Sequence, residues 1–211
     1  MDATFQISEV FQTSWKHVKS QIWVLAGLVI GICLISFTIN LFTMPLQGST
    51  VGMIIAYLIS LFISAVFSVG YIKNLFQVME GDEPQFSAYL QSFPKIFNIL
   101  IANILFGIVF FIGLCLLVIP GIYLYLRLQF FAQFIVDEDA GAVDSLKRSW
   151  NLTQGKAMSL LLLALTQILL IIIGVILFGI GVFVTYPIAA MMSCYVYRIL
   201  NKVEVQEEIS A

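Results

Sequence analysis

Long stretches of the sequence contain no charged residue, and they alternate with short polar segments. Uncharged, mostly apolar windows lie within Lys19–Lys73, Lys95–Arg127 and Lys156–Arg198. A helix of about 20 apolar residues is long enough to cross the hydrocarbon core of a bilayer. The pattern therefore predicts a polytopic membrane protein of the all-α class.

Turn-forming residues divide each window into two helices. The first window breaks at Thr43–Thr50, the second at Pro120-Gly121 and the third at Gly179–Gly181. Proline removes a backbone donor, and glycine allows the chain to reverse. Six membrane-spanning helices follow, grouped as three hairpins: near Ile22–Phe42, Val51–Gln77, Ile96–Val118, Ile122–Val136, Ala157–Phe178 and Val182–Leu200.

Basic residues indicate how the predicted helices are oriented. Nine of the ten Lys and Arg residues lie in the termini or in the connections between hairpins, and the three hairpin turns hold none. All twelve acidic residues lie on that same side. Because Lys and Arg concentrate on the cytoplasmic side, we predict a multi-pass protein of the inner cell membrane with both termini in the cytoplasm.

Composition agrees with a membrane protein and gives no indication of a metal, a cofactor or nucleic acid. Hydrophobic residues make up 61% of the chain and charged residues 10%, whereas soluble domains carry about 25% charged residues. The net charge of −2 comes without a basic arm. Cys33, Cys115 and Cys194 lie apart in apolar runs, so we expect free thiols.

Short charged segments before each predicted hairpin carry apolar residues at helical spacing. Such spacing favours amphipathic helices that lie in the membrane interface with the apolar face towards lipid. Asp139 is a candidate N-cap for the third of them. Each segment also has a serine followed by an aromatic residue, at Ser14-Trp15, Ser92-Phe93 and Ser149-Trp150. The predicted apolar faces are Ile7, Val10, Phe11, Trp15 and Val18; Phe86, Tyr89, Leu90 and Phe93; and Val143, Leu146 and Trp150.

An interfacial helix followed by a hairpin therefore occurs three times, which predicts a threefold internal repeat. The chain forms a single integral membrane domain over 1–211, with repeat units at about 5–82, 83–138 and 139–202 and a short cytoplasmic tail at 203–211. Parallel repeats of this kind are related by an axis along the membrane normal.

Small residues recur at every fourth position in two of the predicted helices. Such stripes let another helix approach closely, so we expect them to be helix-packing positions. Gly27 and Gly31 form a further pair at this spacing, which is weak evidence alone. The stripes are Gly52, Ala56, Ser60, Ser64 and Ser68 in the first hairpin, and Gly181, Thr185, Ala189 and Ser193 in the third.

Several motifs fill the second half of the chain: Ile119-Pro120-Gly121-Ile122, Leu126-Arg127-Leu128, Asp137-Glu138, the stretch from Leu146 through Ser149-Trp150 to Thr153 and Gly155, and Tyr195-Val196-Tyr197-Arg198. They resemble the membrane domain fused to some glycerophosphoryl diester phosphodiesterases and the related YciC-type inner-membrane proteins. The resemblance implies a six-helix inner-membrane module. Phosphodiesterase activity is not expected, because the chain has one histidine and no room for the soluble catalytic domain.

Arg127 is the basic residue that the topology does not explain, since it interrupts an apolar segment. Six residues past Pro120 correspond to about 9 Å along a helix, which predicts a position in the outer half of the bilayer. Charge at that depth is costly and often functional. Three interpretations remain open: the side chain extends to the outer headgroups, hydrogen-bonds to an amide such as Asn103 or Gln167, or binds a lipid or another anionic ligand.

Other polar residues complete a candidate lipid- or ligand-binding site, in which a basic and aromatic cluster could contact anionic lipid. The acidic run Asp137-Glu138-Asp139 either belongs to a helix-capping loop or binds a divalent cation. No catalytic constellation is recognisable in the sequence. The candidate site residues are Arg127, Gln129, Gln133, Lys147, Arg148 and Trp150.

These observations predict a non-enzymatic integral membrane protein that acts in lipid handling, transport or envelope homeostasis, with membrane lipids as its partners. One alternative is a small transporter or channel with a site near Arg127. A weaker alternative is an enzyme that acts on lipid headgroups at the acidic run. The sequence leaves the oligomeric state open, a homo-oligomer included.

Overall fold

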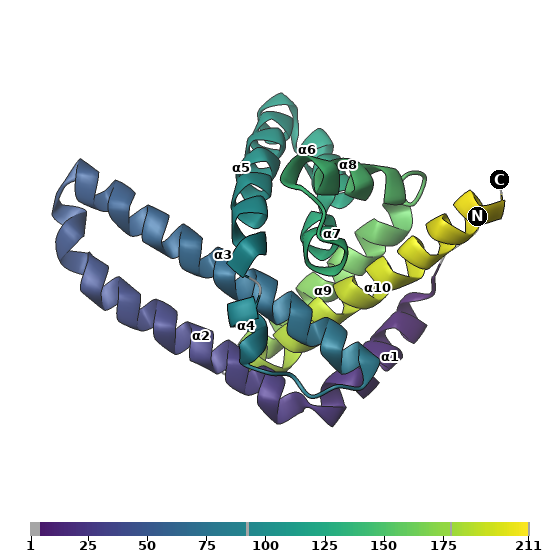
Figure 1. Ribbon diagram of the computed structural model, residues 1–211, viewed down its shortest axis with the longest axis horizontal. Coiled ribbons are helices and arrows are strands. Elements are labelled where there is room, and N and C mark those ends of the chain that lie inside the picture. Colours follow the sequence, from purple (N-terminus) through teal and green to yellow (C-terminus); the bar gives the residue numbers. More distant parts are fainter. Residues whose placement is uncertain (1–4, 92, 178, 211) are drawn as a thin grey trace.

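The computed structural model describes residues 5–91, 93–177 and 179–210, and it is built of helices (Figure 1). No strand occurs in these ranges. The elements in chain order are α1 (Ile7–Ser20), α2 (Ile22–Thr43), the 3₁₀ helix η1 (Met44–Gly48), α3 (Thr50–Glu80), α4 (Ser87–Gln91), α5 (Phe93–Leu116), α6 (Val118–Leu128), α7 (Phe131–Glu138), α8 (Ala142–Leu152), α9 (Ala157–Ile176) and α10 (Val182–Ser210).

Within the described ranges, six helical segments are long and apolar enough to cross a membrane, which confirms the predicted all-α fold with six spans. The 3₁₀ helix η1, which carries Pro45, connects α2 to α3. The threefold repeat, the hairpin grouping and the repeat units stay predictions. The spans are Ile22–Leu46, Thr50–Glu80, Pro94–Cys115, Val118–Glu138, Ala157–Ile176 and Val182–Lys202.

The fourth span differs from its prediction as a single helix over Ile122–Val136. The chain reverses at Leu117, whose backbone is extended (φ −170°, ψ 155°), and α6 begins before Pro120-Gly121. Proline fits there because the first N–H groups of a helix have no intrahelical acceptor. The span is then interrupted after Leu128 and continues as α7. The predicted breaker therefore lies inside the helix, and the break comes later in the chain.

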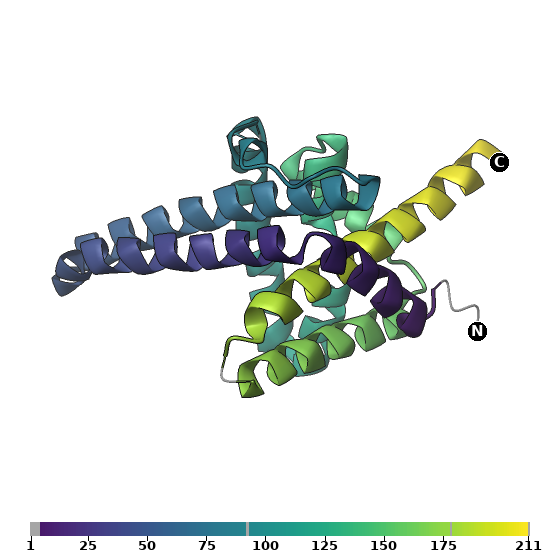
Figure 2. The ribbon, with the colours of Figure 1, turned by 90° about the horizontal axis from the view of Figure 1, so that it is seen from below.

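The ends of α2 and α3 that adjoin η1 extend away from the other helices, whereas α5, α6 and α7 pack beside α8, α9 and α10 (Figures 1 and 2). The core lies where α3, α5, α7 and α10 meet, around Leu75, Ile96, Ile135 and Tyr197. The far ends of α2 and α3 keep large apolar side chains exposed. Apolar exposure on this scale marks a membrane-facing or partner-facing surface. Examples are Leu34, Phe37, Phe42, Val51, Ile54 and Tyr57.

The first two predicted amphipathic segments are helical, but to different extents. α1 packs against α10 and buries Val10, Ser14 and Val18, while Trp15 keeps 37% of its surface exposed. α4 is a helix of five residues, and the predicted dipeptide at Ser92 lies outside the described residues. Whether these helices lie in a membrane interface stays a prediction.

The third segment, α8, buries a face different from the predicted one: Leu146 packs only partly against the core, and three small side chains together with Leu152 face the protein. Val143 and Trp150 remain 52% and 37% exposed. The prediction that Asp139 is the N-cap of α8 is wrong. α8 begins after Gly141, and Asp139 ends α7 in a left-handed conformation (φ 55°). Its carboxylate pairs instead with Lys95 (2.8 Å). The buried residues of α8 are Ala142, Ser145, Ser149 and Leu152.

Candidate functional site

Arg127 lies in the last turn of α6 and is almost completely buried, with 3% of its surface exposed. Its guanidinium carbon is 4.3 Å from the centre of the Trp150 ring and 5.8 Å from that of Tyr123. Aromatic faces attract cations, and more strongly where water is excluded. Nε has no hydrogen-bond acceptor among the described residues. Aromatic rings from α6 and α8 therefore cover the charge.

The amides that the sequence suggested as partners of Arg127 are placed elsewhere. Gln167 donates from Nε2 to the Ala189 carbonyl (2.9 Å) and to Ser193 Oγ (2.7 Å), which ties α9 to α10. Asn103 lines a depression between α5 and α3. In the described part of the chain, neither amide is hydrogen-bonded to Arg127.

The backbone of Arg127 is held by two hydroxyl side chains at the end of α8 and directly after it. Its carbonyl oxygen accepts hydrogen bonds from Ser149 Oγ (3.0 Å) and Thr153 Oγ1 (3.0 Å). The Phe130 N–H donates to Ser149 Oγ (3.1 Å). Backbone groups at a helix end need such partners when they are buried. Ser149 of α8 and Thr153, which follows α8, therefore stabilise the break between α6 and α7, and Trp150 between them covers Arg127.

The other sequence-predicted site residues do not gather around Arg127. Gln129 donates from Nε2 to the Leu126 carbonyl of its own helix (3.0 Å). Gln133 is buried and faces α3 and α10 in a separate cavity. Lys147 is exposed, and Arg148 pairs with Asp144 and Glu138 on the surface of α8. The structure thus brings Arg127 and Trp150 together and separates the remaining candidates.

The acidic run at the end of α7 is engaged in ion pairs with three different helices. Asp137 pairs with Arg198 of α10 (2.7 Å), Glu138 with Arg148 of α8 (2.8 Å), and Asp139 with Lys95 of α5 (2.8 Å). No group of His, Cys, Asp and Glu in the described ranges could hold a metal ion. The sequence did not predict these ion pairs, although Lys95 and Arg198 lie on the same predicted side of the membrane as the acidic run.

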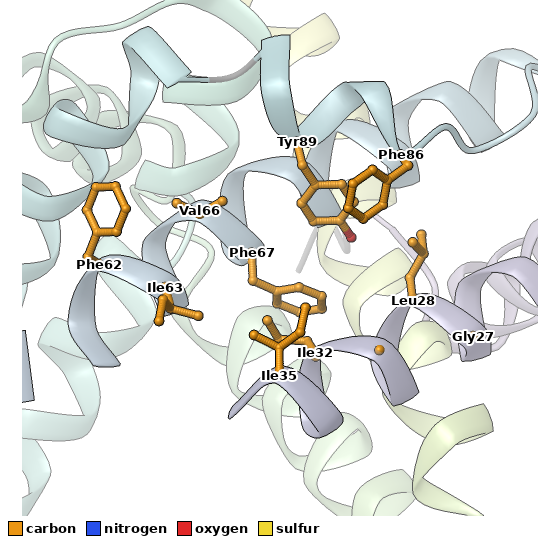
Figure 3. Close-up of a pocket in the computed structure, with 11 residues that line it drawn as sticks. Gly27, Leu28, Ile32, Ile35, Phe62, Ile63, Val66, Phe67, Phe86 and Tyr89 are labelled. Carbon is orange, nitrogen blue, oxygen red and sulfur yellow. The ribbon is translucent and has the colours of Figure 1, made fainter. Parts of the chain in front are cut away.

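A pocket of about 480 Å³, the apolar pocket, lies between α2, α3 and the segment that leads into α4 (Figure 3). Figure 3 shows Phe86 and Tyr89 on one side of the pocket and the residues of α2 on the other. Its lining consists of apolar and aromatic side chains together with two glycines: Gly27, Leu28, Gly31, Ile32, Ile35, Phe62, Ile63, Val66, Phe67, Phe86 and Tyr89.

Gly27 and Gly31 leave the α2 side of the apolar pocket open. A Cβ atom at either position would meet no other atom within 4 Å. The sequence suggested this pair as a weak helix-association motif, which would require close contact with another backbone. Here the missing side chains create space in place of a helix contact.

Two features of α3 hold the opposite side of the apolar pocket in place. Asn74 is buried and accepts a hydrogen bond on Oδ1 from the Gln85 N–H (2.8 Å), which fixes the chain before α4. The Tyr89 ring lies against Gly70, where a Cβ atom would overlap it, and stacks on Phe67 at 5.9 Å. Burial raises the pKa of Tyr89 to about 12.

The small-residue stripes occupy several different environments. Gly52 is needed at the turn, because a Cβ there would overlap the Leu46 carbonyl. Gly181 lies against Gly174 where α9 and α10 meet. Ser60 is exposed and bonds back to its own helix. The remaining positions are buried Ala56 and Thr185, exposed Ser64, and Ser68, Ala189 and Ser193 at the cavity that contains Gln133.

Comparison with known proteins finds a family and distant relatives. Residues 51–205 match a domain of unknown function (DUF7847). The uncharacterized protein Rv2560 of Mycobacterium tuberculosis is 32% identical over 111 residues, which are 53% of this chain and 34% of that protein. The uncharacterized protein Mb2590 of Mycobacterium bovis is 31% identical over a segment of the same length and coverage.

This chain therefore matches about a third of the length of the curated relatives. No solved structure matches it. The family match extends from the start of α3 into the last part of α10, so it includes the buried arginine, the acidic run and one side of the apolar pocket. The chain belongs to the family that carries the domain of unknown function DUF7847.

Proposed function

We propose that this protein handles membrane lipids without catalysing a reaction, and that the apolar pocket holds the acyl chain of a lipid. The observation that carries the proposal is a pocket of about 480 Å³ with an apolar lining, opened by two glycines on a helix that is apolar enough to span a membrane. Small-molecule pockets have roughly 300–1,000 Å³, so its size suits one part of a lipid.

The chemistry of the lining favours hydrocarbon over water as the occupant. A bound water molecule needs about two to four polar partners, and the side chains of the apolar pocket offer almost none. Filling the pocket with a hydrocarbon chain removes apolar surface from water at about 25 cal/mol per Å². Lipid acyl chains are the hydrocarbon available to a helix in a membrane.

The location belongs to the same proposal: the inner cell membrane, with both termini in the cytoplasm. Support comes from the distribution of Lys and Arg, since the connections and termini carry nine of the ten basic residues. The resemblance of the second half to a module fused to glycerophosphoryl diester phosphodiesterases also agrees with a role near lipids, because glycerophosphoryl diesters are the polar parts of phospholipids.

Native mass spectrometry of the protein purified in detergent tests this proposal by counting retained phospholipids. We expect the wild type to retain one phospholipid and the double variant Gly27→Leu/Gly31→Leu to lose it, because leucine side chains would fill the apolar pocket. Gly107→Leu is the matched control, since Gly107 lies on α5 and also has no neighbour within 4 Å of a Cβ position. Equal retention by all three proteins would contradict the proposal.

A further inference from the structure

A second cavity of about 280 Å³, the polar cavity, lies between α3, α7, α9 and α10. It shares no lining residue with the apolar pocket, so a ligand of the polar cavity does not depend on lipid binding in the apolar pocket. The small-residue stripes of α3 and α10 meet here, which leaves room between helices that otherwise pack closely. Its polar lining residues include Ser68, Tyr71, Gln133, Gln167, Ser193 and Cys194.

Two side chains of the polar cavity carry polar atoms without a partner. Tyr71 is 2% exposed and Gln133 is 6% exposed. The Tyr71 hydroxyl and Gln133 Oε1 have no hydrogen-bond partner in the part of the chain that the structure describes. Buried polar groups are almost always hydrogen-bonded, because an unmade bond lowers stability. Two orphan groups in one cavity therefore indicate a ligand that satisfies both.

Gln167, the other amide that lines the polar cavity, makes hydrogen bonds within the protein. Gln167 donates from Nε2 to the Ala189 carbonyl and to Ser193 Oγ, at 2.9 Å and 2.7 Å. Its hydrogen bonds join α9 to α10 and serve the fold. The Gln133 side chain is hydrogen-bonded to Cys194 of α10, but its Oε1 atom and the Tyr71 hydroxyl have no partner among the described residues, so helix packing does not account for these two atoms.

The lining also defines the charge of the ligand. Among the described residues that line the polar cavity, none is Asp, Glu, Lys, Arg or His. A charged ligand there would be desolvated without a counter-ion, which is strongly unfavourable. Gln133 Oε1 requires a hydrogen-bond donor, and the Tyr71 hydroxyl can donate to an acceptor. The ligand must then be uncharged and carry both a donor and an acceptor.

We propose that the polar cavity binds a small uncharged solute with hydroxyl or carboxamide groups, which bridges Gln133 of α7 and Tyr71 of α3. The bridge joins the interrupted fourth span to the second span. Solute sites of helical transporters are often formed at interrupted helices, and the polar cavity lies beside the interrupted fourth span.

Saturation-transfer difference NMR on the full chain in lipid nanodiscs tests this site with two probes, acetamide and glycerol. We expect a saturable signal for at least one probe with the wild type. Tyr71→Phe and Gln133→Leu should each weaken binding about three- to tenfold, the effect of one neutral hydrogen bond. Ala190→Leu, which fills the polar cavity, should abolish it.

Matched variants test whether a loss of binding comes from the polar cavity or from a general effect of substitution on the protein. Tyr125→Phe and Gln129→Leu change the same residue types on α6 and at its end, away from the polar cavity, and should bind like the wild type. Gly27→Leu/Gly31→Leu should also bind normally, because it alters only the apolar pocket. Circular dichroism confirms that each variant is folded. The absence of a saturable signal for both probes, or equal binding by wild type and Tyr71→Phe, would overturn the proposal and leave a cavity that holds water alone.

Discussion

The Ser149 hydroxyl donates a hydrogen bond of 3.0 Å to the carbonyl oxygen of Arg127, and this contact joins α8 to the break in the fourth span. The same Ser149 oxygen accepts the Phe130 N–H at 3.1 Å. One buried serine thus serves a carbonyl and an amide that the end of α6 leaves without helical partners. The contact explains why the span can be interrupted inside the protein.

Ser149→Ala should destabilise the protein, because it leaves the Phe130 N–H buried without an acceptor. We expect a loss of about 1–2 kcal/mol in the free energy of unfolding, measured by thermal unfolding in detergent. Ser20→Ala is the control, since its hydroxyl is exposed and bonds within α1, and it should change stability by less than about 0.5 kcal/mol. Equal effects of the two substitutions would show that the α8 contact is unimportant.

Arg127→Met should leave the free energy of unfolding unchanged or increase it. The guanidinium is buried beneath Trp150, and its Nε has no acceptor among the described residues, so its desolvation is only partly compensated. Replacing such a charge by an apolar side chain of similar size is often neutral or stabilising by about 1–4 kcal/mol. Chemical denaturation measures the free energy of unfolding, once in neutral detergent and once in detergent with anionic lipid. Destabilisation confined to anionic lipid would instead identify a lipid phosphate as the missing partner.

Asp137 and Arg198 should be coupled more strongly than an exposed ion pair. Their side chains are 19% and 28% exposed, and their oxygen and nitrogen atoms are 2.7 Å apart. A double-mutant cycle with Asp137→Ala and Arg198→Ala should give a coupling free energy of about 1 kcal/mol or more. The pair Asp144 and Arg148 within α8 is about half exposed and should give about 0.3–0.5 kcal/mol. Equal coupling would mean that the pair does not hold α7 to α10.

Alanine at Gly70 and at Gly107 should have opposite effects, although both glycines lie in helices. A Cβ at Gly70 would overlap the Tyr89 ring, whereas one at Gly107 would meet nothing within 4 Å. Gly70→Ala should cost about 1–3 kcal/mol through overpacking and reduce lipid retention. Gly107→Ala should stabilise the protein by about 0.5–1 kcal/mol, because helical glycine is unfavourable. Calorimetry and native mass spectrometry check both; stabilisation by Gly70→Ala would contradict the packing described for Tyr89.

The six spans could be predicted because their signal is local. The windows without charge and the turn residues near Pro45 and Gly179 define helix lengths without reference to any distant contact. Pro120 was assigned to a turn from the local sequence alone, because proline breaks helices. In the structure it lies in the first turn of α6. The choice between the two depends on packing against α5.

The candidate sites could be predicted only in part. Arg127 and Trp150 stand out in the sequence, but their contact joins residues that are distant along the chain. The apolar pocket was not foreseen, because Gly27 and Gly31 look like a packing motif until the position of α4 is known. The sequence predicted that Gln133 belongs to one site with Arg127. In the structure, Gln133 of α7 lines the polar cavity together with Tyr71.

The sequence by itself determined that the chain is a bundle of helices apolar enough for a membrane, since hydrophobicity and helix length are properties of each segment alone. The tertiary structure decided which side chains lie together: Trp150 over Arg127, Lys95 and Arg198 on the acidic run, and Tyr89 across from two open glycines. Those contacts depend on how separate helices cross, and the periodicity of one helix carries no information about its neighbour.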